Sequence, residues 1–407
     1  MNQILDSIVI ALQAIWANKL RSFMTVLGNI VAVTSIVTVV TLIQGMNAMV
    51  SEAIVSDVGA DSFTVQRRPP IRSEDDEERT RNNPMLTLDE ARAIRSFSPV
   101  ITSVMAQASR SATVSYRDDE LQNISIQGVT SEFADFSTFT AERGRMMSGV
   151  EVERSQPAAL IGFDLADRLF GEVSPLDKSI KIAGVPFRVV GVSEKKGSFF
   201  GSSQDNFAVI PLGAYQKLFG ARQSLTLTVK PTSTEQLQVA MDDATVALRV
   251  ARRLKPRDPD NFGMFTSDTI LDLYRQVTSG IFAVLVGIVA LSLVVGGIVI
   301  MNIMLMVVTE RTREIGLRKA LGARRKDIMS QILTESITLS TFGGIIGIFL
   351  GFLAATAISA LTPLPARLEP WSIVLGVGIA AAVGLFFGAY PASRAAGLDP
   401  IEALRRE

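Results

Sequence analysis

Apolar residues gather in four long runs, and each run predicts a helix that crosses a membrane. At a rise of about 1.5 Å per residue, each run is long enough for a hydrocarbon core of roughly 30 Å. The first run is too long for the apolar region of a signal peptide and lacks a short basic start, so we expect it to be retained. The predicted spans are residues 23–45, 281–308, 332–361 and 371–390.

Helical spacing of apolar residues also occurs next to the first two spans. Residues 1–22 predict an amphipathic helix on the cytoplasmic surface of the membrane, or alternatively a cytoplasmic helix packed on a partner protein. Residues 46–59, which end at a candidate cap glycine, and residues 269–280 predict stalks that extend two of the spans. The segment between the stalks, residues 60–268, is therefore predicted to be a large domain outside the membrane.

Strand and helix signals alternate in this outer domain and predict an α/β fold. Thr87 and Glu90 form a capping box at the start of one predicted helix. Two βαβ-like halves enclose residues 111–220, which predicts a ferredoxin-like layer with an inserted β-rich lobe. Residues 67–84 are expected to form a mobile charged loop. The other predicted elements are strands at residues 61–66, 100–108, 121–129, 158–161, 179–182, 187–192, 225–230 and 262–265, and helices at 87–95, 164–170 and 233–254.

Small and weakly polar residues recur within the spans. Polar residues in the first span indicate a helix–helix interface rather than a surface facing lipid: Asn29, Thr34, Ser35, Thr38 and Thr41. Glycines at intervals of four or eight residues in the last two spans predict close packing of helices, within one subunit or between two. These helix-packing candidates are Gly343, Gly347, Gly351, Gly376, Gly384 and Gly388.

Composition excludes several classes of function. The chain of 407 residues is 48% apolar and has zero net charge, which is not typical of a soluble nucleic-acid-binding protein. It contains no Cys and no His, so thiolate chemistry, His-based catalysis and the usual zinc ligands are excluded, and we predict no catalytic or metal site. No ionisable residue lies in the middle of a span, which argues against ion-coupled transport and intramembrane proteolysis.

The segment between the second and third spans, residues 309–330, is short and rich in basic residues. A basic excess in a short loop marks the cytoplasmic side, and it puts both termini there as well. Its residues favour a helix, with Glu314 and Arg318 as an i,i+4 pair and Gly322 as a left-handed cap. Ile315 and Leu321 offer a small apolar surface, so we expect this helix to dock into a partner. The alternative is a basic loop that only fixes topology.

The sequence of this segment resembles the signature of a known family. Residues 310–323 read ERTREIGLRKALGA and are followed by Glu335 at the start of the next apolar helix. This pattern resembles permease subunits of MacB-type ABC transporters, a superfamily that includes FtsX-like and lipoprotein-releasing permeases. Residues 184–211 resemble the extracytoplasmic domain of its macrolide-exporter branch, and the tail, residues 391–407, also fits the family.

The resemblance implies that the basic segment is a coupling helix held in a groove of a separate ABC ATPase subunit. No G-x-x-x-x-G-K-[ST] string occurs in these residues, so ATP and Mg²⁺ are expected on that partner, and we predict that this chain is not an enzyme by itself. The other expected partners are a second copy of the chain, a membrane-fusion (adaptor) protein and lipids of the bacterial cytoplasmic (inner) membrane. The candidate coupling residues are Glu310, Arg311, Arg313, Glu314, Ile315, Gly316, Arg318, Lys319 and Gly322.

Three functions follow as hypotheses. The first is a permease that transmits ATP-driven motion to its outer domain for efflux of a drug, peptide or secreted compound. The second keeps the ATPase but regulates cell-wall hydrolases or releases lipoproteins. The third is a membrane receptor without transport, which leaves the coupling-type segment unexplained.

Overall fold

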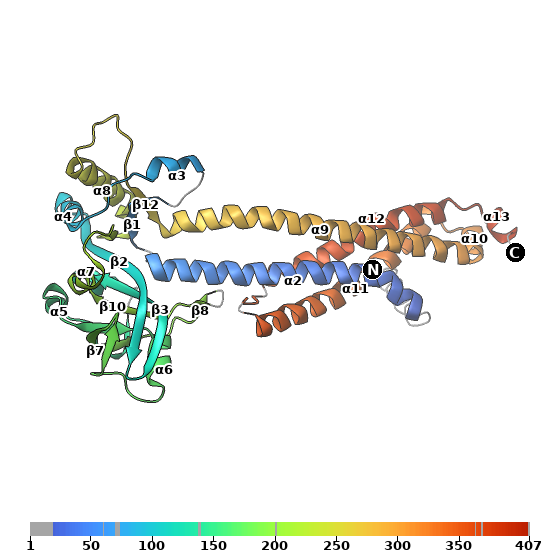
Figure 1. Cartoon of the computed structure of the whole chain (residues 1–407). Coiled ribbons are helices and arrows are strands. Elements are labelled where there is room, and N and C mark those ends of the chain that lie inside the picture. The colour runs from blue at the N-terminus through green and yellow to red at the C-terminus, as the bar shows by residue number, and fades with distance from the viewer. Residues whose placement is uncertain are drawn as a thin grey trace. The chain divides into compact units, whose positions relative to one another are not determined.

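The computed structural model describes residues 19–59, 61–69, 74–136, 140–199, 202–362, 364–367 and 369–405. Contacts within the chain divide it into two compact units (Figure 1). The membrane unit comprises Met1–Ala48 and Val277–Glu407, and the outer domain comprises Met49–Gln276. Residues 1–18 of the predicted amphipathic helix lie outside the described residues.

Four of the described helices are long and apolar enough to cross a membrane, as the apolar runs predicted. The first two continue well beyond the length of a bilayer, and the first ends just before Gly59, whose φ of +87° favours glycine. The helices with residues in the membrane unit are α2 (Lys19–Val58), α9 (Ser267–Glu310), α10 (Thr312–Ala320), α11 (Arg325–Leu361), α12 (Pro370–Gly397) and α13 (Pro400–Arg405).

Glycines of α11 bring it against α2. A Cβ atom at Gly347 would lie 2.9 Å from the carbonyl oxygen of Ile30, and one at Gly351 would lie 2.9 Å from that of Thr34. At Gly343, a Cβ atom would overlap the Val26 side chain. Because only hydrogen atoms separate the helices at these positions, backbones approach closely enough for side-chain hydroxyls to reach carbonyls across the interface.

Side-chain hydrogen bonds join α11 to α2 on one face and to α12 on the other. On the α2 side, Thr34 Oγ1 donates to the Gly347 carbonyl at 3.1 Å, and Asn29 Nδ2 donates to the Ser340 carbonyl at 2.6 Å. Thr38 repeats the first contact at Gly351, so the predicted interface is confirmed at these three positions. Ser35 instead donates within α2, to the Val31 carbonyl at 2.9 Å. On the α12 side, Ser336 Oγ donates to the Gly384 carbonyl at 2.9 Å. Ser340 Oγ donates to the Ala380 carbonyl, and Gly376 and Gly388 face Ile348 and Ser336 of α11.

The outer domain is built on one ten-stranded sheet in which β12, β1, β11, β2, β3, β10, β5, β7 and β4 are neighbours in that order, while β6 pairs with β2 and β7 (Figure 1). Two very short strands form a separate hairpin. The strands are β1 (Phe63–Gln66), β2 (Ile101–Tyr116), β3 (Asp119–Val129), β4 (Ala141–Gly144), β5 (Ala158–Ile161), β6 (Ser179–Ile182), β7 (Val185–Ser193), β8 (Ser198–Phe199), β9 (Ser202–Ser203), β10 (Phe207–Pro211), β11 (Thr226–Pro231) and β12 (Gly263–Thr266).

Part of this sheet has ferredoxin-like connectivity. The units β1–α4–β2 and β11–α8–β12, with α4 at Leu88–Phe97 and α8 at Leu237–Ala251, form four antiparallel neighbours in the order β12-β1-β11-β2. The prediction of a strand that ends at residue 108 is wrong, because β2 continues to Tyr116. Its first half pairs with β11 and its second half with β3 and β6, so the inserted segment extends the same sheet.

Several short elements of the outer domain were not predicted. The charged segment expected as a loop, residues 67–84, contains α3, and the helix expected at 233–254 begins as a 3₁₀ turn, η2, before α8. Helical elements of three to eight residues carry at most a weak periodic pattern, and of this length only α6 was expected. They are α3 (Glu74–Thr80), η1 (Ser131–Asp135), α5 (Gly149–Glu153), α7 (Leu212–Phe219) and η2 (Thr234–Gln236), whereas α6 (Phe163–Phe170) was expected at 164–170.

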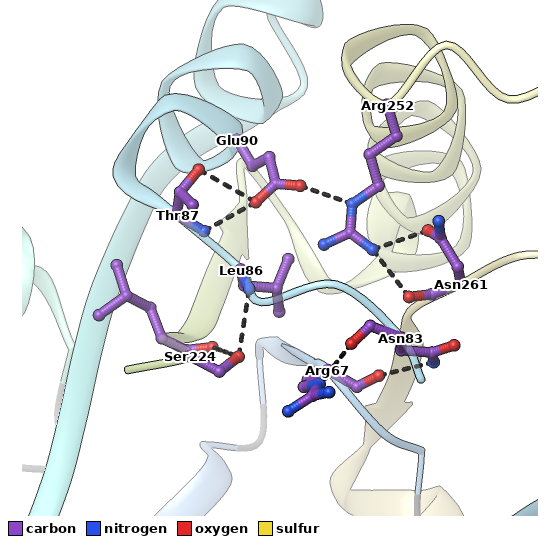
Figure 2. Close-up of polar contacts among 9 residues, drawn as sticks. Arg67, Asn83, Leu86, Thr87, Glu90, Ser224, Arg252 and Asn261 are labelled. Carbon is purple, nitrogen blue, oxygen red and sulfur yellow. Dashed lines mark hydrogen bonds and ion pairs between the residues drawn. The ribbon is translucent and has the colours of Figure 1, made fainter. Parts of the chain in front are cut away.

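A buried ion pair joins α4 to the end of α8 (Figure 2). Glu90 Oε2 accepts a hydrogen bond from the Thr87 amide at 2.7 Å, which confirms the predicted capping interaction, and its Oε1 accepts from Arg252 Nε. Arg252 Nη1 donates to the carbonyl and the side-chain oxygen of Asn261 at 2.7 Å each. The side chains of Arg252 and Glu90 are only 6% and 11% exposed, so loss of either partner would leave a buried charge unpaired.

We expect Arg252→Met to destabilise α8 by about 3–5 kcal/mol, because Glu90 would keep its charge without a partner. Hydrogen exchange of α4 and α8 amides in the purified full chain measures this effect. The matched control is Arg92→Met, since Arg92 forms an exposed pair with Asp89 and should contribute less than about 1 kcal/mol. Equal protection of α8 in the two variants would contradict the structural role of the buried pair.

We expect Gly347→Val to destabilise the membrane unit by about 1–3 kcal/mol or more, because the added atoms collide with the α2 backbone. Thermal unfolding in detergent, followed by circular dichroism, measures the change. Gly378→Val is the control, because a Cβ atom there meets nothing within 4 Å. If both variants unfold at the same temperature, close approach of α2 and α11 is not required.

Candidate functional site

The basic segment between the second and third spans folds as a separate short helix, α10. It ends in a Schellman motif: the Gly322 amide donates to the Lys319 carbonyl and the Ala323 amide to the Arg318 carbonyl, both at 3.1 Å. Gly322 has a φ of +101°, so the predicted left-handed cap is present. A capped end turns the chain sharply into α11, whose first turn is closed by Asp327 accepting from the Arg324 amide at 2.9 Å.

One face of α10 packs into the membrane unit. Ile315 is 5% exposed and belongs to an apolar cluster that also contains Val308, Ile328 and Ala392, from α9, α11 and α12. Gly316 lies against α13, where a Cβ atom would come within 2.6 Å of the Ala403 side chain. This face therefore contacts residues from several helices of the same chain.

Charged residues on the same side make specific contacts. Lys319 Nζ donates to the Ala396 carbonyl at 2.9 Å and to the Leu398 carbonyl, at the C-terminal end of α12, where a cation is favourable. Arg311 pairs with Glu335 of α11 at 3.3 Å, and the Glu335 side chain is 13% exposed. These contacts connect α10 to α11 and α12.

Arg318 links the two sides of the helix. Its Nη2 pairs with Glu314 at 2.6 Å, which confirms the predicted i,i+4 pair, and its Nη1 donates to Gln331 of α11 at 2.6 Å. Glu310 is exposed at the last position of α9.

The outward face of α10 carries a different set of residues. Arg313 and Glu314 are exposed, and next to them Leu317 and Leu321 are 51% and 81% exposed. The expectation that Ile315 supplies an apolar surface for a partner is wrong, because that side chain is buried in its own chain. Helical spacing explains the difference: residues 313, 317 and 321 share one face, whereas 311, 315 and 319 share another. This spacing separates the two faces in the sequence, but the neighbouring helices decide which face is buried.

Two family models together match most of the chain. The model described as a MacB-like periplasmic core domain matches residues 22–247, and the model described as an FtsX-like permease C-terminal matches residues 286–400.

Curated relatives carry the name macrolide export ATP-binding/permease protein MacB. The protein of Bdellovibrio bacteriovorus is 34% identical over 397 residues, which cover 97% of this chain and 61% of that protein. The protein of Chlorobaculum tepidum is 35% identical over 407 residues, 100% of this chain and 62% of the relative. The chain thus spans about six tenths of the length of the curated relatives it matches.

Among solved structures, the periplasmic region of MacB from Actinobacillus actinomycetemcomitans aligns with a TM-score of 0.45 and 19% identity, covering 54% of this chain and 95% of that one. Membrane-spanning helices together with the matched families are typical of a bacterial inner-membrane protein. With its matched core-domain and permease regions, the chain belongs to the MacB-like family and is a MacB-like permease of the ABC transporter family.

Proposed function

We propose that this chain transmits ATP-driven movement of a separate ABC ATPase subunit through its membrane unit to its outer domain. The observation that carries the proposal is the two-sided character of α10. Its inner face is fixed to α11, α12 and α13, while Arg313, Glu314, Leu317 and Leu321 are exposed on the other. In such a helix, a displacement caused by the ATPase subunit on the outer face is transmitted through the inner face to the other helices.

The exposed face has the composition of a docking surface. Single exposed leucines are ordinary on protein surfaces, but here two lie one helical turn apart beside charged residues. The following residues Arg324, Arg325 and Lys326 are also exposed and basic. An apolar groove with an acidic rim on the partner would complement this surface. In this proposal the ATPase subunit, present as a dimer, binds ATP and Mg²⁺, and this chain supplies no catalytic group.

We further propose that the chain works as a homodimer with both termini in the cytoplasm and serves export of a drug, peptide or secreted compound together with a membrane-fusion adaptor. The support for export is the name of the curated relatives and the lack of ionisable residues in the middle of the spans. Movement of the outer domain, rather than an ion gradient, is then the source of work on the cargo.

Affinity purification of the tagged chain from its native membrane tests the choice of partners. We expect a P-loop ATPase and an adaptor protein among the proteins that remain bound. Recovery of the ATPase with a cell-wall hydrolase or a lipoprotein instead would favour the FtsX-like or lipoprotein-release alternative. Absence of any ATPase from the purified complex would contradict the coupling role of α10.

We expect the double change Leu317→Ser and Leu321→Ser, or Arg313→Glu, to weaken binding of the ATPase subunit at least tenfold. Such a loss corresponds to about 1.4 kcal/mol, within the usual range for interface residues. Binding to the full chain in nanodiscs and stimulation of ATP hydrolysis are the measurements. Arg222→Glu, an exposed charge reversal in the outer domain, is the control. Unchanged stimulation in the α10 variants would show that this face is not the docking surface.

A further inference from the structure

A regular stripe of large apolar side chains runs along the exposed side of α9, the long helix that contains the second span (Figure 1). The residues recur at alternating intervals of four and three positions, and each is between 42% and 67% exposed. This spacing is a heptad repeat, the pattern of helices that pack side by side in a left-handed coiled coil. Its a positions are Ile281, Ile288 and Val295, and its d positions are Val277, Val284, Leu291 and Ile298.

The membrane unit uses a different side of α9 for its own packing. Val289, Ile300 and Met304 are at most 6% exposed and belong to apolar clusters with residues of α2, α11 and α12. Gly296 lies against the backbone of Gly28 in α2. These residues occupy b, c and f positions of the same heptad, so the a and d stripe points away from the helices of its own chain.

The repeat continues into Asn302, which occupies the next a position after Val295. Residues 281–308 contain two side chains with a hydroxyl or an amide, Ser292 and Asn302. Ser292 donates to the Ile288 carbonyl of its own helix at 3.2 Å. Asn302 is exposed, and its amide has no hydrogen-bond partner within the described part of the chain.

An unpaired amide is costly at this depth in a membrane. Asn302 lies about 12 Å along the helix from Glu310, where α9 ends, and its side chain is short. Lipid chains offer no hydrogen bonds, so an amide that faces them loses the partners that water would supply. The position therefore favours a neighbouring helix that brings hydrogen-bonding groups to the same depth.

A second copy of α9, parallel to the first, meets this requirement by symmetry. In a parallel pair each a residue lies beside its own counterpart, so Asn302 meets Asn302 of the partner subunit, and each amide both donates and accepts. A single polar residue at an a position also fixes the register of such a pair. Gly280 and Gly287, which flank the stripe at g positions and have nothing within 4 Å of a built Cβ atom, leave room for a close approach.

We propose that the a and d stripe of α9 is the surface through which two copies of this chain meet in the membrane, with paired Asn302 side chains setting the register. The inference rests on the proposed homodimer and names its contact surface, and it does not depend on the ATPase or on the cargo. Apolar side chains gain little from a helix partner over lipid, so the Asn302 pair supplies specificity that the stripe alone lacks.

Disulfide cross-linking of the full chain in its native membrane tests the surface. Because the chain has no cysteine, each variant carries one thiol. Val295→Cys and Ile298→Cys should form linked dimers at least tenfold faster than Leu385→Cys, which is 51% exposed on α12. The control lies at a similar depth, because Phe387 of α12 packs on Gly297 of α9.

Equal rates at the three positions would overturn the proposal, and so would linkage of the α9 thiols to a different protein. The mass of the complex, measured in nanodiscs, separates this failure from that of the proposed homodimer. A dimer by mass without α9 cross-links contradicts only the contact surface, whereas a monomer contradicts both.

The role of Asn302 is tested in the Ile298→Cys background. Asn302→Ala should slow cross-linking at least fivefold, and Asn302→Gln, which keeps an amide, should retain most of the rate. Ser292→Ala is the control, since Ser292 is bonded within its own helix. The circular dichroism spectrum should be unchanged in all three variants, which separates loss of pairing from loss of folding. An unchanged rate in Asn302→Ala would overturn the pairing role.

Discussion

Close approach of helix backbones is the constraint on which the membrane unit depends. Between helices in lipid there is no hydrophobic driving force, so association rests on van der Waals packing and on hydrogen bonds between helices. Gly28 and Gly296 illustrate such close packing. A Cβ atom on Gly28 would lie 2.7 Å from the Gly296 Cα atom, so the backbones of α2 and α9 are in contact there. The glycines and hydroxyls of α11 achieve the same with α2 and α12. These four helices are thereby joined into one bundle within a single chain.

Contacts with other helices of the membrane unit hold α10 in a fixed position. A basic loop that only fixed membrane topology would leave its side chains to water and lipid headgroups. Instead, Arg311, Ile315 and Lys319 each contact another helix of the same chain, through an ion pair, apolar packing and hydrogen bonds to carbonyls. These contacts are of different kinds and reach different helices, so α10 is fixed to the bundle at several points. The residues left facing outward are then the ones available to a partner.

Sequence analysis captured what local chemistry determines. Four apolar runs indicated the spans, Gly322 the end of α10 and the Thr87–Glu90 pair the start of α4, because each is a local signal with one dominant structural outcome. The length of β2 was not predictable, since its second half is stabilised by β3 and β6, which lie later in the chain. The burial of Ile315 was missed for a related reason: which face of a short helix points inward depends on its neighbours in space.

A pocket in the outer domain illustrates the same limit. Its lining comes from α4, η1, α5 and α7, which are brought together from positions 88 to 216, so no local sequence pattern could have assembled it. The middle of the spans has no ionisable residue. Between the outer domain and α10, α9 runs unbroken from the residue after β12 to Glu310, immediately before the turn into α10. In our proposal this continuous helix, rather than a polar path through the membrane, carries movement along the chain.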